Sequence, residues 1–500
     1  MPSALLRWTG HPLVDVGIAT LCAMAQVSSP DDLTLENLDQ AAEEMACYYF
    51  NGSMGAYLTC VFPNAGYVNA TMTKEKRDEY KQRILYAHRS KPDAKTSGKN
   101  CAFSGESATH LIDRAQLPLS TGAGILNFYP ASSGGCYIAG PYLTALQALP
   151  LGGRRADGRL LIGHADVPEI TLALARRYLE DNQRYLHLTS INEGDAIARS
   201  KPWANKYPDA SAPRTLLLSD LSDILRTRKV AKGPTSVTGY WLTNSGQGPA
   251  LDIFTIPSNF VRFLELVGNK NLTGQWNRML ARGWAGYESS NAGASGKRTT
   301  AKKAAAKKQS GGIGPGRSKN QVLEDLLAIF SDGFVYPEAA QRFVRVHLLG
   351  AAGNTEHIRS PQTWRLTELF LTEILGMNSE KISQIRLFAD KLAKFIQDEH
   401  DGKKLLRAIL FQADQPWKLR RALVNALTRH FRSNDTLLFD FNEYINVFEA
   451  EDAVRISDWS LIRDLLTIGI IEKLATSTKE QSHEALKEVV EEENEPDVAV

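Results

Sequence analysis

The most regular pattern of apolar and polar positions lies in residues 321–475. Apolar residues there recur at i, i+3, i+4 and i+7, the spacing that keeps them on one side of an α-helix. Ser, Asp or Pro stands near the start of several segments, as is common at helix N-termini. The pattern predicts a bundle of six to eight helices. The segments are NQVLEDLLAIFS, PEAAQRFVRVHLLG, SPQTWRLTELFLTEILG, SEKISQIRLFADKLAKFIQDE, KKLLRAILFQA, QPWKLRRALVNALTRHF and WSLIRDLLTIGIIEKLA.

Residues 1–288 mix two periodicities. The segment Pro168–Leu188 has apolar residues at helical spacing and begins with proline, so it predicts a helix. The stretches GRLLIGHAD and PRTLLLSDL predict short buried strands. Because both kinds are interleaved and bounded by Gly, Pro and Asn, we expect an irregular α+β domain and not a βαβ repeat.

Two segments have compositions that cannot build a core. Residues 289–320 combine small residues and glycine with eight cations and no acid, which predicts a flexible basic linker. Residues 476–500 are acidic with few apolar groups, which predicts a frayed tail. The expected fold is therefore an α+β N-terminal domain (1–288), the linker (289–320), an all-α helical bundle (321–475) and the tail (476–500).

Composition adds the broad class of the protein. The 500 residues are 43% hydrophobic and 23% charged, as in soluble globular proteins, and the length suits two or three domains. Five cysteines are too few and too scattered for a disulfide scaffold, which favours a reducing compartment. No stretch reaches the apolar length of a membrane span. We expect a cytoplasmic protein without membrane contact.

Two turn-like stretches, CAFSG and GGCYIAG, each hold one cysteine where a zinc knuckle holds two. The positions that would complete the pairs are Ser104 after Cys101 and Ala139 after Cys136. Structural zinc needs four thiolate or imidazole ligands, and Ser and Ala do not supply them. We therefore expect degenerate knuckles, with Cys101 and Cys136 close in space, Phe103 and Tyr137 packed nearby, and no metal or other cofactor.

The stretch GHAD places His164 and Asp166 at the end of a predicted strand. Two titratable groups at such a position suit acid/base work, but the sequence indicates no third partner for them. An enzyme using this pair is one alternative interpretation of the chain.

Cations are dense in two consecutive predicted helices, where Asp414 is the one acid after Asp401. A shared basic face would suit the backbone of a polyanion, although a solvated helix face is the ordinary alternative. The cations are Lys403, Lys404, Arg407, Lys418, Arg420, Arg421, Arg429 and Arg432.

Several motifs follow one another over about the first 265 residues. They are WTGHPLVDVGIATLCAMA, FPNAGYVNATMTKEKRDEY, the two knuckles flanking PLSTGAGILNFYP, PYLTALQALPLG, GRLLIGHADVPEITLALAR and YWLTNSGQGPALDIFTIPSNFVRFL. In this order they resemble the CRISPR-associated CXXC-CXXC family, which supplies the large subunit of type I-B Cascade, an RNA-guided antiviral surveillance complex. The chain departs from that family at Ser104 and Ala139, so the metal of the family is not carried over.

The resemblance implies a non-catalytic subunit of a ribonucleoprotein. Such a subunit lies beside the one that holds the 5′ handle of the guide RNA, reads the protospacer-adjacent motif (PAM) on target DNA and promotes opening of the duplex into an R-loop. Its helical C-terminal region helps to hold the DNA strands and is, in related systems, also made as a separate small subunit. Implied partners are guide RNA, target DNA, the backbone and other Cascade subunits, and a recruited helicase-nuclease or transposition proteins.

Candidate DNA contacts follow from this interpretation. The amides of Asn244 and Gln247, in the loop TNSGQG, can pair with base edges. The cations expected at phosphates are Lys302, Lys303, Lys307 and Lys308 in the linker and Lys418, Arg420, Arg421 and Arg429 in the bundle. A second alternative treats the helical half as a protein-interaction scaffold without DNA contact.

Overall fold

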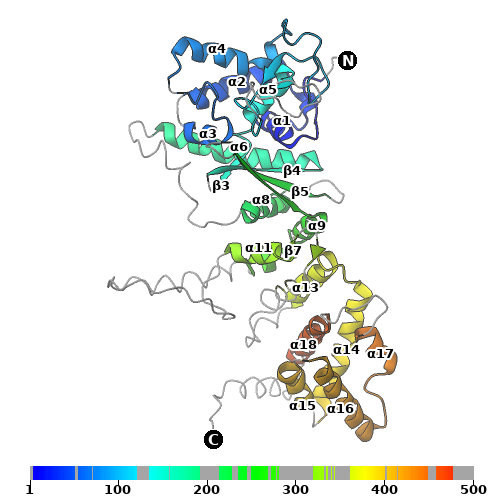
Figure 1. The fold of residues 1–500 in the computed structure, drawn as a ribbon. Helices are drawn as coiled ribbons and strands as arrows, with labels where there is room; N and C mark the ends of the chain where they lie inside the picture. The colour runs from blue at the N-terminus through cyan, green and yellow to red at the C-terminus, as the bar shows by residue number, and fades with distance from the viewer. Residues whose placement is uncertain are drawn as a thin grey trace, which may run out of the picture. The chain divides into compact units, whose positions relative to one another are not determined.

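The computed structural model of the protein is mostly helical, with small antiparallel sheets (Figure 1). It divides into two compact units, residues 1–265 and 266–500. The predicted domain boundary at 288, nearly all of the linker and the tail from 477 onward lie outside the described residues, so they stay predictions. The structure describes residues 4–50, 54–69, 71–120, 135–156, 158–191, 213–227, 235–244, 249–268, 272–277, 279–280, 319–331, 334–335, 339, 343, 361–399, 402–413, 415–448 and 458–476.

The first unit is built around α1 (Pro12–Met24), which is buried along most of its length. It contacts α5 and α6, and Gly17 lies close against the backbone of α5. A Cβ at Gly17 would lie 2.1 Å from the carbonyl oxygen of Ala145. The other helices of this unit are α2 (Leu35–Phe50), α3 (Gly55–Val61), α4 (Lys74–Ile84), α5 (Gly140–Ala148), α6 (Pro168–Ile191), α8 (Pro213–Thr227), α9 (Ser258–Val267, which runs across the division) and the 3₁₀ turns η1 (Pro30–Asp32) and η2 (Ala87–Arg89).

An antiparallel sheet of four strands has the order β3 (Arg154–Ala156), β4 (Arg159–Ala165), β5 (Val237–Thr243) and β6 (Ala250–Ile256). The predicted strand in GRLLIGHAD is β4, and the predicted helix from Pro168 is α6, so both are confirmed. A smaller ladder joins β1 (His110–Ile112) to β2 (Cys136–Ile138).

Paired glycines let α8 approach the larger sheet closely. Gly163 of β4 lies opposite Gly239 of β5, and a Cβ on either would come within 2.9 Å of the Leu217 side chain of α8. A side chain at either position would therefore push the helix away from the sheet.

The strand predicted in PRTLLLSDL is wrong, because this stretch begins α8. Three consecutive leucines resemble a buried strand, but over the longer window Leu217, Leu221 and Ile224 are buried at helical spacing. Pro213 stands at the start, where proline is favoured in helices, and leucine is itself a good helix former.

In the second unit, the described parts of the predicted helices are mainly helical, but the helix predicted over NQVLEDLLAIFS ends at Leu327, and Phe330–Ser331 of this segment form a strand. One short antiparallel pair of strands, β7 and β8, departs from an all-helical description. The elements are α11 (Lys319–Leu327), β7 (Phe330–Ser331), β8 (Phe334–Val335), α13 (Pro361–Glu373), α14 (Ser379–Asp398), α15 (Gly402–Arg407), the π-helical turn η5 (Ala408–Gln412), α16 (Pro416–Asn434), α17 (Phe441–Phe448) and α18 (Asp458–Thr476).

The core of the second unit forms mainly between α14 and α18. Phe388, Leu392 and Phe395 of α14 are buried, and the Phe388 ring lies 4.8 Å from that of Phe439. Among the described helices of the chain, none has the length and apolar character needed to cross a membrane.

Candidate nucleic-acid interface

The helix α16 buries one side and exposes the other. Leu419, Leu423 and Ala426 are buried, at the 4–3 spacing of a single helical stripe. Trp417, Val424 and Phe431 are spaced seven residues apart, two helical turns each, and lie on the opposite side, where they are 56%, 52% and 49% exposed. Large apolar side chains are thus presented to solvent by a helix whose core contacts are already made.

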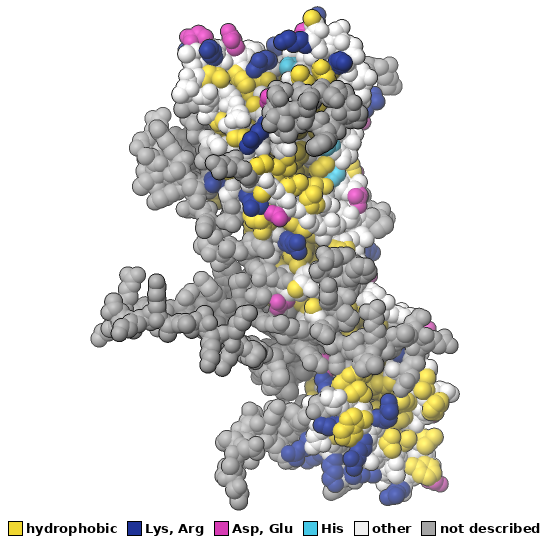
Figure 2. All heavy atoms as spheres, viewed as in Figure 1, with side chains coloured by type: hydrophobic (Ala, Val, Ile, Leu, Met, Phe, Trp, Pro, Cys, Tyr) yellow, Lys and Arg dark blue, Asp and Glu magenta, His cyan; other side chains and the backbone are white. Residues whose placement is uncertain are grey.

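Cations lie among these exposed apolar residues. The helix α16 contains five cations and neither Asp nor Glu, and we call its exposed side the basic–aromatic face. Figure 2 shows lysine and arginine side chains gathered beside hydrophobic ones at the end of the helical unit where Figure 1 places α15 and α16. The face comprises Trp417, Lys418, Arg420, Arg421, Val424, Thr428, Arg429, Phe431 and Arg432.

Local contacts hold part of this face in place. The Lys418 ammonium lies 5.7 Å from the centre of the Trp417 ring, and Arg420 Nε donates a hydrogen bond of 3.2 Å to the Tyr444 hydroxyl. The neighbouring helix α15 contacts α16 and exposes Lys403, Lys404 and Arg407, which extend the positive charge. Exposed rings interleaved with arginines suit a polymer that offers both phosphates and flat bases.

Asn244, predicted to read bases, is fully buried at the end of β5. Its Nδ2 donates to the carbonyl oxygens of Val61 and Arg114, and its backbone N–H donates to the Cys60 carbonyl at 2.6 Å. In this conformation the amide joins three segments of the first unit and cannot reach a base edge. Its Oδ1 is buried without a hydrogen-bond partner, which is the costly state for such an atom.

The remaining predicted PAM and linker contacts fall on positions that the structure does not describe. These are Gln247, Lys302, Lys303, Lys307 and Lys308. Lys418, Arg420, Arg421 and Arg429 all lie on α16, so the predicted bundle contacts belong to one helix.

The two degenerate knuckles lie on neighbouring segments. The backbone N–H of Ala102, next to Cys101, donates to the carbonyl of Tyr137, next to Cys136, at 2.9 Å. Both cysteines are buried in one hydrophobic cluster, against which Phe103 packs. In the described part of the chain, no group of three or more His, Cys, Asp or Glu side chains is arranged to hold a metal.

His164 and Asp166 have separate partners. His164 Nε2 lies 3.2 Å from Asp15 Oδ2, whereas Asp166 accepts hydrogen bonds from the backbone N–H and hydroxyl of Ser236. Asp15 also accepts from Thr9. Burial would raise the pKa of Asp15, but the hydrogen bonds from His164 and Thr9 outweigh it and hold the pKa below its ordinary value. This arrangement fixes a buried carboxylate between the residues before α1 and the sheet.

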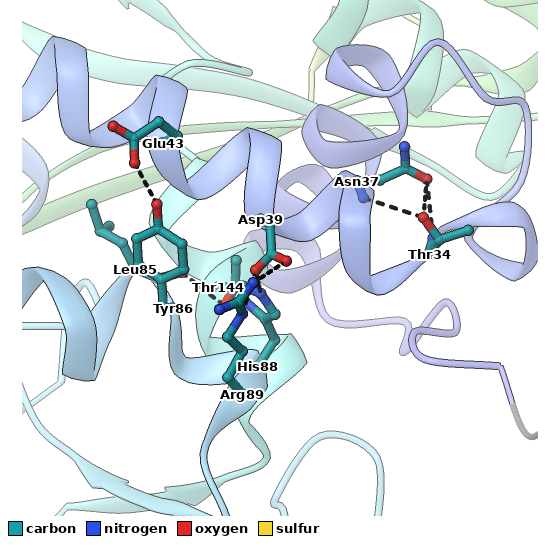
Figure 3. A network of polar contacts seen from close by, with 9 residues as sticks. All are labelled: Thr34, Asn37, Asp39, Glu43, Leu85, Tyr86, His88, Arg89 and Thr144. Carbon is teal, nitrogen blue, oxygen red and sulfur yellow. Dashed lines mark hydrogen bonds and ion pairs between the residues drawn. The ribbon is translucent and has the colours of Figure 1, made fainter.

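A second histidine–aspartate pair lies between α2 and η2 (Figure 3). His88 Nε2 lies 2.8 Å from Asp39 Oδ1, its Nδ1 lies 3.2 Å from the Thr144 hydroxyl, and Arg89 Nε donates to the same Asp39 oxygen. Burial lowers the pKa of His88. The nearby Asp39 carboxylate raises that pKa and so offsets part of the effect. The pair thus joins α2 to η2 and, through Thr144, to α5.

No protein-family model, no curated protein and no solved structure matches this chain.

Sequence reasoning found the cations of α16 but missed its exposed apolar residues. The signal was present, because Trp417, Val424 and Phe431 recur every seven residues, on the side of the helix opposite Leu419 and Leu423. Asp15, in contrast, had no local signal as the partner of His164, since 149 residues separate them.

Proposed function

We propose that this chain is a non-catalytic, nucleic-acid-binding subunit of an RNA-guided complex, the large subunit of a type I-B Cascade. In this proposal the α+β unit recognises the PAM and promotes duplex opening, and the helical bundle holds the separated strands. The layout of an α+β domain followed by a helical bundle is part of the proposal, as are the guide RNA, the other Cascade subunits and a cytoplasmic location.

The observation that carries the proposal is the basic–aromatic face of α16. A polyanion backbone gains from the five cations without sequence preference, because phosphates are alike along the strand. Unstacked bases gain from the exposed rings of Trp417 and Phe431, since every base has a flat face. A single strand offers both groups at once, whereas a duplex keeps its bases stacked.

The order of motifs in the first 265 residues supports the assignment to a Cascade. In RNA-guided recognition, base pairing reads the sequence while protein reads the PAM and the shape of the nucleic acid. A subunit with this role needs cations that bind the nucleic-acid backbone whatever its base sequence. It does not need a catalytic centre. The burial of Asn244 leaves the loop residues 245–248, Gln247 among them, as the part of TNSGQG that the proposal assigns to the PAM.

The proposal is tested by isolating tagged full-length chain from cells that express it at its natural level. We expect it to copurify with short RNAs that share one repeat-derived 5′ handle, and with several other proteins in fixed ratio. The resulting complex should bind target duplex only when the PAM is present. A chain that is recovered without such RNAs, or a complex that selects PAM-bearing targets equally well without the chain, would contradict the proposal.

A further inference from the structure

The basic–aromatic face of α16 has the charge to attract a negatively charged segment. Its five cations have no acidic residue within α16 itself, and three large apolar side chains stand exposed among them. Within the same chain, the segment richest in acid is the stretch after α18, residues 477–500. It contains Glu480, Glu484, Glu488, Glu491, Glu492, Glu493, Glu495 and Asp497 and only two lysines.

The acidic segment also carries apolar residues suited to the exposed rings. Leu486, Val489 and Val490 lie among the glutamates. A segment that offers carboxylates to arginines and aliphatic side chains to Trp417 and Phe431 matches both components of the face.

The place where the segment begins allows this contact. It follows directly on α18, and α18 contacts α16 within the helical unit. The 19 residues of α16 extend about 28 Å. The 24 residues from 477 to 500 would span up to about 80 Å if extended, so their length is enough to cover the helix.

We infer that residues 477–500 dock on the basic–aromatic face of α16 and compete there with the nucleic-acid backbone. A tether of this length holds the segment at an effective concentration on the order of 1 mM, so even a weak contact is substantially occupied. A nucleic acid must then displace the acidic segment before it binds. As a competitor, the segment lowers the apparent affinity for every polyanion at this face by the same factor, so weakly held ones are released while tightly held ones stay bound. This favours strands delivered by guide pairing over stray nucleic acid.

The inference rests on the proposed function for its consequence, but the contact itself is tested without nucleic acid. The photoreactive substitution Thr428→p-benzoyl-Phe places the crosslinker on the face, where Thr428 is exposed. After irradiation of the full-length protein, mass spectrometry should recover crosslinks to peptides from residues 477–500. The same crosslinker at Leu387, an exposed apolar position of α14, is the control. Crosslinks from Thr428 that never reach the segment would overturn the inference.

Competition is measured as the Kd for a fluorescent oligo(dT) strand at about 100 mM salt. Removing residues 477–500 should lower the Kd by about three- to tenfold, and changing the five glutamates at 488, 491, 492, 493 and 495 to glutamine should reproduce much of that gain at full length. Both gains should vanish in the variant Arg421→Gln, Arg429→Gln, Arg432→Gln, which lacks the cations competed for. An unchanged Kd on truncation would overturn the competition, whereas crosslinks to the segment without oligonucleotide binding would refute the proposed function and leave the contact standing.

Discussion

His164 Nε2 lies 3.2 Å from Asp15 Oδ2, although 149 positions separate the two residues in the sequence. Asp15 lies in α1 and His164 in β4. The Asp15 carboxylate is almost wholly buried and also accepts hydrogen bonds from the Thr9 N–H, the Thr9 hydroxyl and the Gly10 N–H. One carboxylate thus ties the residues before α1 to the first turn of that helix and to the sheet. The stability of the first unit should depend on it.

We therefore expect Asp15→Asn to lower the free energy of unfolding by about 3 kcal/mol. The substitution removes the charge and replaces one buried acceptor oxygen by an N–H donor, so some of the part-buried N–H and hydroxyl groups that donate to Asp15 lose their acceptor. Urea unfolding followed by circular dichroism measures the loss. Asp166→Asn is the control, because the exposed Asp166 carboxylate contacts Ser236 at the surface and should cost less than about 1 kcal/mol. Equal losses in the two variants would contradict the role given to Asp15.

His88 should make stability fall on mild acidification. Burial lowers its pKa below the ordinary value of 6.5, with Asp39 opposing the shift, so the unfolded chain takes up a proton at a pH where the folded chain does not. The resulting loss of stability begins as the pH falls through about 6.5. His11 and His110, whose pKa values burial also lowers, act in the same direction.

The test for His88 is the free energy of unfolding between pH 7.5 and 5.5. In His88→Gln the dependence on pH should be shallower than in the unaltered protein, since one group that distinguishes the two states is gone. An identical dependence would show that folding leaves the pKa of His88 unchanged, and a steeper one that folding raises it; either would contradict the lowered pKa.

Gly17 should not tolerate a side chain. In Gly17→Ala the new Cβ would meet the backbone carbonyl of Ala145, which cannot rotate away, so α1 and α5 would have to separate. We expect a loss of about 3 kcal/mol or more. Gly55→Ala, at the start of α3 with open space around the new Cβ, should leave the unfolding midpoint nearly unchanged. A Gly17→Ala protein as stable as Gly55→Ala would refute the close helix crossing.

The rings of α16 should contribute to binding independently of salt. Trp417→Ala should weaken binding of a single-stranded oligonucleotide by about 1–2 kcal/mol, roughly 5- to 30-fold in Kd, at every salt concentration, because stacking does not involve counterions. Leu387→Ala, which removes an exposed apolar side chain from α14, is the matched control and should bind as the unaltered protein does. A Trp417 effect that disappears at high salt would indicate loss of charge placement instead of stacking.

The sequence predicted helices best where burial follows a single period. In α14, apolar residues at i, i+3, i+4 and i+7 mark the buried side directly, and Asn378 caps the helix as polar residues before a helix do. The apolar period gave the wrong prediction at α8. Leu216, Leu217 and Leu218 are consecutive there, and a short window of apolar residues cannot distinguish a strand from a helix.

The candidate site divides in the same way. The cations of α16 could be predicted from the sequence, because the charge of a lysine or arginine follows from the residue type alone. Asn244 looked like a loop amide, but the backbone carbonyls of Val61 and Arg114 that bury it come from distant segments, so only folding could show its surroundings. The pairing of His164 with Asp15 was hidden for the same reason.

The central claim, that α16 binds nucleic-acid backbone, is tested most directly by the salt dependence of oligonucleotide affinity. The slope of log Kd against log salt concentration is measured for the full-length protein and for Arg421→Gln, Arg429→Gln, Arg432→Gln. The control, Arg386→Gln, Lys391→Gln, Lys473→Gln, removes the same charge from cations that are paired with Glu472, Glu443 and Asp390. Each phosphate contact contributes about 0.7 to the slope for a single strand, so the α16 variant should have a slope smaller by about 2 and the control an unchanged slope. An α16 variant whose affinity and slope equal those of the unaltered protein would contradict the claim.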